Sequence, residues 1–189
     1  EIIETNIALE KNLKLIENEE YISIDTEFIR DNTYFSKLCL IQVASKNHSF
    51  IIDPLKEDVK LDSLRKILNK DTIIKIFHSG RQDMEIFYHL FGELPKPIYD
   101  TQIAAMVCGF GDQVSYENLV NTLLNIRIDK SSRVSNWSFR PLTEKQIIYA
   151  LSDVTHLVRI YEKLKNQISN ENRSLWIEDE MKSLAETKN

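Results

Sequence analysis

The sequence has few of the residues that mark fibrous, disulfide-stapled or disordered chains. Its 189 residues include 4 Gly, 4 Pro and 2 Cys, and 42% are hydrophobic and 28% charged. These proportions are typical of a globular domain and exclude a collagen-like chain, a low-complexity chain and a disulfide scaffold. The sequence lacks the uninterrupted apolar run that a membrane span requires, and its first residues do not resemble a secretion signal. We therefore expect one domain over residues 1–189 and no membrane partner.

The thiols and the net charge narrow the function classes. Cys39 and Cys108 have apolar neighbours and no CxxC or His spacing, which favours two free thiols in a reducing cytoplasm. The net charge of -5 argues against a protein that holds nucleic acid by basic phosphate contacts alone. An acidic chain can still bind phosphate where metal ions supply positive charge. A metal-dependent nuclease therefore remains open.

Hydrophobic spacing in the first half predicts one helix followed by three strands. Apolar residues at helical spacing predict a helix over residues 5–17. Three segments have the patterns of strands. Residues 21–28 alternate between apolar and polar, and residues 37–44 are nearly all apolar. Residues 48–53 form a short segment that contains β-branched side chains. Because the connections between these strands are short, we expect an antiparallel meander.

The second half alternates helices and strands. The patterns predict helices over 61–68, 81–91, 101–107, 116–124 and 174–184, and strands over 73–77 and 97–100. A long helix is expected to begin at Thr143, because Thr143-Glu144-Lys145-Gln146 fits a capping box. A meander followed by helix–strand alternation indicates a mixed α/β sheet flanked by helices.

Two carboxylates on the first strand of the meander point to one place. Asp25 and Glu27 are two residues apart, so both side chains project from the same face of a strand. Like charges held together are costly unless a cation or a proton relieves them. A solvated sheet edge is the structural alternative for this pair.

Three residues further along the chain can complete an acidic site. Tyr149 and Asp153 are four residues apart and share one helix face, and Asp83 lies near the start of the helix predicted over 81–91. Their structural alternatives are a packed Tyr beside a rim Asp and a carboxylate that complements a helix dipole. Together, four carboxylates suit two hard divalent cations that activate water and stabilise the leaving oxygen of a phosphodiester. A nearby Tyr hydroxyl can orient the attacking water.

The segments around these residues resemble the DEDDy class of 3′–5′ exonucleases and, within it, ribonuclease D. The resemblance is carried, in the family's order, by Ser23-Ile-Asp-Thr-Glu-Phe28 with Leu40-Ile-Gln-Val-Ala44, by Phe77-His-Ser-Gly-Arg-Gln-Asp-Met-Glu-Ile-Phe87 with Tyr99-Asp-Thr-Gln102, and by Asn136-Trp-Ser-Phe-Arg-Pro-Leu142 with Gln146 and Tyr149-Ala-Leu-Ser-Asp-Val154. It implies a ribonuclease H-like α/β fold, in which a mixed five-stranded sheet begins as an antiparallel meander, continues with parallel strands and is flanked by helices.

The resemblance also implies a role for each site residue. Asp25 is expected to bridge two divalent cations, Mg²⁺ or Mn²⁺, while Glu27 and Asp153 complete the ligands of the nucleophile-side cation. Asp83 is expected to hold the second cation, directly or through water, and Tyr149 to position the attacking water. The implied activity is hydrolysis of single-stranded RNA from its 3′ end to nucleoside 5′-monophosphates, in the maturation of transfer RNA or other stable RNA.

Seven residues near the motifs are candidates for contacts with the substrate: Thr26, Phe28, His78, Arg81, Gln82, Trp137 and Arg140. The last two belong to residues 127–140, the most basic stretch of the chain, whose aromatic and Arg side chains suit a single strand. Structural alternatives remain open. Phe28 and Trp137 can be core residues, and His78 can be buried with its hydrogen bonds satisfied. Arg140 can be an ion-pair partner, and a solvated helix start explains Arg81 and Gln82.

One departure from the family concerns the C-terminal side. Ribonuclease D carries helical RNA-binding domains after its nuclease domain, and too few residues follow the long helix here for such a module. The expectation is therefore a nuclease domain alone, without a C-terminal helical RNA-binding domain. Two alternatives remain, namely the same reaction on DNA and a non-catalytic nucleic-acid-binding domain. Retention of the whole acidic set favours the enzyme.

Overall fold

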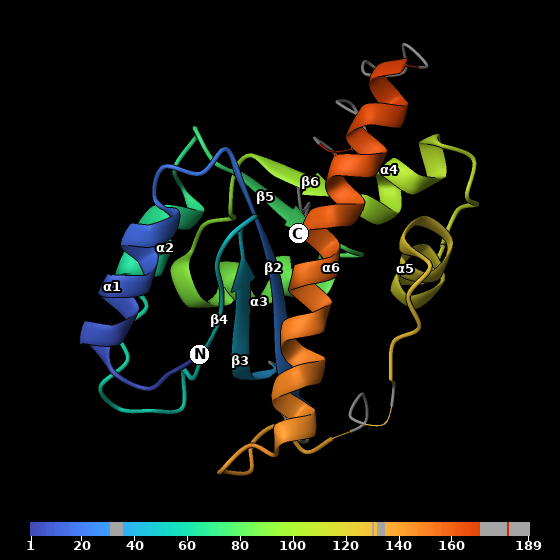
Figure 1. Ribbon diagram of the computed structural model, residues 1–189. Coiled ribbons are helices and arrows are strands. Elements are labelled where there is room, and N and C mark those ends of the chain that lie inside the picture. The colour runs from blue at the N-terminus through green and yellow to red at the C-terminus, as the bar shows by residue number, and fades with distance from the viewer. Residues whose placement is uncertain (31–35, 130, 132–134, 171–180, 182–189) are drawn as a thin grey trace.

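The computed structural model describes residues 1–30, 36–129, 131, 135–170 and 181 (Figure 1). The helix expected over 174–184 therefore lies outside the described residues, apart from position 181. The elements, in chain order, are β1 (Ile2–Ile3), α1 (Asn6–Ile16), β2 (Tyr21–Ile29), β3 (Lys37–Ala44), β4 (Ser49–Ile52), α2 (Asp62–Leu68), β5 (Ile74–Phe77), α3 (Arg81–Phe91), β6 (Ile98–Asp100), α4 (Thr101–Val107), α5 (Tyr116–Leu124) and α6 (Glu144–Asn170).

The strands form one mixed sheet in the order β1-β4-β3-β2-β5-β6. The antiparallel meander of β2, β3 and β4 is confirmed, and β5 and β6 continue the sheet in parallel. The expectation of five strands is wrong, because β1 pairs in parallel with β4 and adds a sixth. A strand of two residues is too short to show alternation, so its formation depends on the edge that β4 offers.

The two faces of the sheet are covered by different helices (Figure 1). Side chains of α1, α2 and α3 pack with Ile22, Ile24 and Val43 in the largest hydrophobic cluster. The opposite face carries Leu40 and Ala44, which pack against Ala150 and Val154 of α6. Because side chains alternate along β2, Asp25 faces α6 whereas Ile24 and Thr26 face the side of α3.

The long helix α6 begins where the capping box predicts. The Gln146 backbone N–H donates to Thr143 Oγ1 (3.2 Å), and the Thr143 backbone N–H donates to Gln146 Oε1 (3.0 Å). The helix runs across the sheet, and its second half packs with α4 and α5 around Ile160 and Leu164 (Figure 1). None of the helices in the described part of the chain is long and apolar enough to cross a membrane.

Candidate active site

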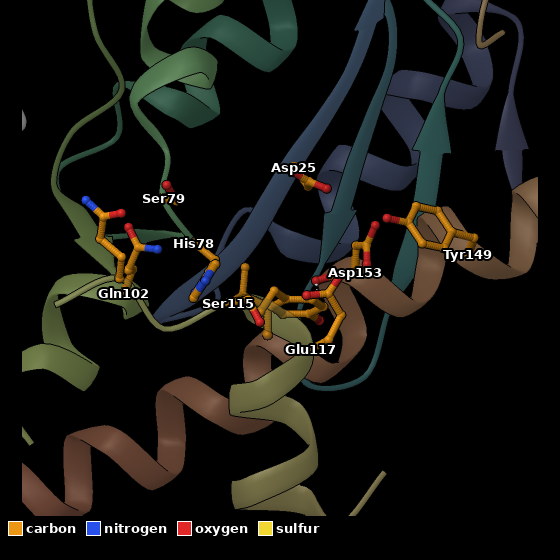
Figure 2. A pocket seen from close by; sticks show the side chains of 11 residues that line it. Asp25, His78, Ser79, Gln102, Ser115, Glu117, Tyr149 and Asp153 are labelled. Carbon is orange, nitrogen blue, oxygen red and sulfur yellow. Dashed lines mark hydrogen bonds between the residues drawn. The ribbon is translucent and has the colours of Figure 1, made fainter. Parts of the chain in front are cut away.

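Three carboxylates meet where β2 faces α6. One oxygen atom from each of Asp25, Glu27 and Asp153 lies within 4.8 Å of the others. The alternation of β2 places the first two on one face, and the crossing of α6 brings the third to them. Figure 2 shows the phenol of Tyr149 directed toward Asp153, from one turn earlier on the same helix. The pairs that the sequence treats separately therefore form one site.

Burial and mutual repulsion make these acids hard to ionise without a counter-charge. Burial, followed by the charge of Asp153, raises the pKa of Asp25 well above its usual range. Burial, followed by the charges of Asp25, Asp153 and Asp83, raises the pKa of Glu27 to about 9. A divalent cation would relieve this repulsion, and its binding would release the protons that the acids hold.

Two side chains fix the backbone of α6 beside Asp153. The Ser23 hydroxyl of β2 donates to the Val154 carbonyl (2.8 Å). The Tyr116 hydroxyl of α5 donates to the carbonyls of Asp153 (2.6 Å) and Ser152 (3.0 Å). These bonds hold three consecutive carbonyls of α6. They therefore fix the position of the Asp153 backbone relative to the strand that carries Asp25.

Asp83 is close to this cluster without being one of the three carboxylates that meet. It lies in the first turn of α3, and its Oδ1 accepts a hydrogen bond from Thr26 Oγ1 (2.6 Å). Burial, followed by the charge of Asp25, raises the pKa of Asp83 well above its usual range. Since β5 pairs with β2 only as far as Ser23, the edge of β2 is open where α3 begins, and Asp83 approaches there. Thr26 was a candidate substrate contact. Its hydroxyl proton is donated to Asp83, so a contact with substrate stays a prediction for this residue.

A tight turn places α3 and therefore Asp83. The Asp100 carboxylate accepts hydrogen bonds from the backbone N–H groups of Ser79 (3.1 Å), Gly80 (2.8 Å) and Gln102 (2.8 Å). A Cβ at Gly80 would lie 2.7 Å from the Cβ of Phe77, so the turn requires glycine there. Sequence reasoning did not identify Asp100 as a site residue, although it belongs to the motif Tyr99-Asp-Thr-Gln102.

A cavity of about 360 Å³ opens beside the acids (Figure 2). Its lining combines the acidic site with polar side chains from the turn between β5 and α3, from α4, and from α5 and the segment before it: Asp25, His78, Ser79, Gln102, Gln113, Ser115, Tyr116, Glu117, Tyr149, Asp153 and Leu157. Seven of these, residues 79, 102, 113, 115, 116, 117 and 157, were not among the candidates. The available signal was weak, because Ser115 is the N-cap of α5 and such a residue is explained by capping alone.

His78 is the one candidate substrate contact that lines this cavity. Its Nδ1 lies 2.9 Å from Thr101 Oγ1 and its Nε2 lies 3.1 Å from the Val114 carbonyl oxygen. Burial lowers the pKa of His78 below its usual value. Nε2 donates to the Val114 carbonyl and Nδ1 lies within hydrogen-bond distance of the Thr101 hydroxyl, so both ring nitrogens have a partner and the ring is held in place.

The other candidates lie around the site. Phe28 packs against the large hydrophobic cluster, with the Arg30 guanidinium 6.0 Å from its ring centroid. Arg81 and Gln82 are exposed in the first turn of α3. For these three residues, a contact with substrate stays a prediction.

Trp137 and Arg140 occupy the positions that the structural alternatives describe. The Trp137 side chain is 2% exposed, packs with Leu40 and Ala150, and has its ring centroid 6.1 Å from that of Tyr149. Arg140 donates from Nε (2.6 Å) and Nη2 (2.8 Å) to the two carboxylate oxygens of Asp53. Trp137 therefore packs beside Tyr149 of the site, whereas Arg140 is paired with Asp53, and a contact with RNA stays a prediction for both.

Comparison with known proteins places the chain in a family. Residues 1–169 match the family model described as 3′–5′ exonuclease. The chain is 45% identical over 187 residues to ribonuclease D of Bartonella henselae, and the match covers 99% of this chain and 46% of the relative. The chain thus spans about half the length of the curated relatives it matches.

Solved structures agree with the sequence comparison. The crystal structure of Escherichia coli ribonuclease D superposes with a TM-score of 0.94 at 35% identity, covering 98% of this chain and 49% of that chain. Brucella melitensis NrnC superposes with a TM-score of 0.82 at 30% identity, covering 92% of this chain and 85% of that chain. The resemblance that the acidic motifs indicate is confirmed, and the chain belongs to the 3′–5′ exonuclease family.

Proposed function

We propose that this chain is a divalent-metal-dependent 3′–5′ exoribonuclease that shortens single-stranded RNA from its 3′ end and releases nucleoside 5′-monophosphates. One observation carries the proposal, namely the three carboxylate oxygens of Asp25, Glu27 and Asp153 within 4.8 Å of one another. The names of the relatives, which include several ribonucleases D, support it.

The donor set fits hard divalent cations. Carboxylate oxygens are the ligands that Mg²⁺ and Mn²⁺ prefer, and burial together with mutual repulsion raises the pKa values of Asp25 and Glu27, an effect that a bound cation would oppose. Asp25, Glu27 and Asp153 would hold one cation, and Asp25 with Asp83 the second. When bound, two such cations make water a stronger nucleophile at neutral pH and stabilise charge on the phosphoryl oxygens. Mg²⁺ is the ion named for the related NrnC structure, and it is the first choice for assay.

The residues around the acids would position the reacting groups. The Tyr149 hydroxyl, directed toward Asp153, orients the attacking water (Figure 2). The water oxygen bonds to phosphorus while the P–O3′ bond breaks, and the electron pair leaves with the 3′ oxygen of the shortened strand, which then takes a proton. The polar cavity lined by Gln102, Ser115 and Glu117 is where the terminal nucleotide would lie.

For the natural substrate we propose a class of RNA rather than one particular molecule. RNA is favoured over DNA because the relatives are ribonucleases, and transfer RNA or another stable RNA in the cytoplasm is the proposed target. The Escherichia coli protein is described as acting in structured RNA processing, and NrnC has been solved bound to the dinucleotide pGG. The first assay is therefore run with a longer single strand and repeated with a dinucleotide.

That assay uses 5′-labelled single-stranded RNA and DNA of equal sequence, each with Mg²⁺, with Mn²⁺ and with chelator. The expected result is a ladder that shortens from the 3′ end of RNA, that requires a divalent cation and that forms faster than the ladder from DNA. Faster degradation of DNA would replace RNA by DNA as the substrate. Binding without cleavage of either strand would favour a non-catalytic nucleic-acid-binding domain.

Tyr149→Phe tests the role of the phenol. We expect a fall of about 10²-fold in the rate of RNA hydrolysis, because water is no longer oriented by the hydroxyl. The affinity for Mg²⁺ should stay near that of the wild type, since the carboxylates are unchanged. Single-turnover rates and Mg²⁺ calorimetry measure the two quantities. A variant as fast as the wild type would contradict this role.

Thr26→Val tests whether the hydrogen bond to Asp83 matters for the reaction. The buried Asp83 carboxylate loses a donor at 2.6 Å, and hydrogen bonds to charged groups contribute about 1.5–3 kcal/mol. We therefore expect hydrolysis to slow by about 10–100-fold. Thr26→Ser keeps the hydroxyl and should retain most of the rate. Equal rates for the Val and Ser variants would show that the methyl and hydroxyl are interchangeable there.

A further inference from the structure

Gln42 is a buried amide without a hydrogen-bond partner next to the acidic site. It lies in β3 and is completely buried, and neither Nε2 nor Oε1 has a partner among the described residues. Buried side-chain amides are almost always paired, because an unpaired one loses its hydrogen bonds to water without replacement. An exception beside a functional site calls for a partner that the metal-free protein does not supply.

The sheet itself shows which residue that partner is. Gln42 is paired with Asp25 across the antiparallel β2–β3 ladder, so the two side chains project from the same face with Cβ atoms about 4.5–5.5 Å apart. The other strand neighbour of Gln42, Ile51 of β4, is apolar. Asp25 is therefore the polar side chain directly beside Gln42 in the sheet.

The residues two positions before and after Gln42 on the same face, Leu40 and Ala44, are apolar. Leu40 packs with Trp137 and Ala150, and Ala44 packs with Val154. The Ser23 hydroxyl, opposite Ala44, already donates to the Val154 carbonyl. Among the residues beside Gln42 on this face of the sheet, Asp25 is therefore the one that carries a carboxylate.

We propose that Gln42 is a positioning residue for Asp25: its amide N–H donates to the Asp25 carboxylate when a divalent cation is bound. This role rests on the proposed function. A ligand that must contact two cations needs a fixed orientation, and a hydrogen bond from outside the ligand set supplies it, as such outer contacts do in other metal sites. In the metal-free protein the same amide is a source of instability. Gln42 therefore costs stability in one state and contributes to cation affinity in the other.

Gln42→Met separates these two effects, because Met has similar length and no hydrogen-bonding amide. We expect the melting temperature of the metal-free chain to rise by about 2–6 °C, since an unpaired buried amide is removed. We expect the affinity for Mg²⁺, measured by calorimetry, to fall by about 10–100-fold. Leu40→Met, on the same face of β3, is the matched control and should bind Mg²⁺ within about twofold of wild type.

Other outcomes would overturn the role in distinguishable ways. Wild-type affinity in Gln42→Met, or an equal loss in Leu40→Met, would overturn the positioning role while leaving the proposed function intact. Failure of the wild-type chain to bind Mg²⁺ and to cleave RNA would overturn the proposed function and this role together. Should Gln42→Met not fold, the side-chain amide signals of Gln42 in ¹⁵N NMR spectra of the wild type decide. We expect them to shift on addition of Mg²⁺, and unchanged signals would refute the hydrogen bond.

Discussion

Asp25→Asn is expected to slow RNA hydrolysis by at least about 10³-fold. Asp25 is the carboxylate beside both Glu27 and Asp153, and its charge is also felt by Asp83. In the proposed mechanism Asp25 would be shared by two cations, so its loss would remove several kcal/mol of electrostatic stabilisation, and each 1.36 kcal/mol is tenfold in rate. Single-turnover hydrolysis of 5′-labelled RNA in saturating Mg²⁺ measures the loss. A rate within tenfold of wild type would contradict the assignment of Asp25 as the bridging ligand.

The stability of the same variant separates a missing ligand from a damaged fold. In the metal-free chain the pKa of Glu27 is raised to about 9 from its usual value near 4.5, and the charge of Asp25 is one cause. Between these two values the folded state holds a proton that the unfolded state has lost, so stability falls as the pH rises through this range. Removing the Asp25 charge weakens this effect. We therefore expect Asp25→Asn, without metal at pH 8, to be at least as stable as the wild type.

Addition of Mg²⁺ completes this test. Wild-type protein should gain thermal stability with rising Mg²⁺, because a ligand that binds only the folded state stabilises it by mass action. The Asp25→Asn variant should lose most of that gain. A variant that is unfolded without metal would instead show that Asp25 supports the fold, and the kinetic loss would then say nothing about catalysis.

The strands that carry the site were predictable because each leaves a pattern in the sequence. The alternation around Ile22, Ile24 and Asp25 indicates β2, and the apolar run over residues 37–44 indicates β3. β1 was not predictable, since Ile2 and Ile3 form a strand only by pairing with Ile51 and Ile52. Its formation depends on contacts between distant parts of the chain, which periodicity does not record.

The site was predictable in pieces rather than as an arrangement. Spacing alone places Asp25 beside Glu27, and Tyr149 above Asp153, but the meeting of β2 with α6 follows only from the family resemblance. The hydrogen bond from Thr26 to Asp83 joins residues 57 positions apart, and no local pattern indicates it. Gln42 shows the same limit, because a single polar residue in an apolar strand has meaning only once its neighbour across the ladder is known.

The basic stretch over residues 127–140 contains two residues, Trp137 and Arg140, whose packing the composition does not indicate. Arg140 and Trp137 have the chemistry of a single-strand binding surface. In the fold, however, Trp137 is 2% exposed and Arg140 faces an Asp53 side chain that is 1% exposed. The guanidinium packs inside the fold because it neutralises the buried Asp53 carboxylate. Leaving that charge buried without a partner would cost far more free energy than removing water from the guanidinium.

Arg140→Ala is therefore expected to destabilise the protein by about 3–5 kcal/mol, because it leaves the Asp53 carboxylate buried without its partner. The guanidinium also donates to the carbonyls of Trp137 (2.7 Å) and Cys39 (2.9 Å), so it joins the segment before α6 to β3. Urea unfolding measures the loss. Arg65→Ala is the matched control, since the Arg65–Glu93 pair is 46% and 41% exposed and should contribute at most about 1 kcal/mol.

Arg140→Lys distinguishes charge from geometry at the same position. An ammonium keeps the positive charge but lacks the planar guanidinium that binds both oxygens of Asp53 and donates to three backbone carbonyls. We expect it to recover only part of the stability lost in Arg140→Ala. Because Trp137 packs against Tyr149, the folded fraction of Arg140→Lys should also hydrolyse RNA more slowly than the wild type. Full recovery of both stability and rate by Lys would mean that the positive charge alone holds the segment before α6. The placement of Tyr149 would then not depend on the bidentate contact of the guanidinium with Asp53.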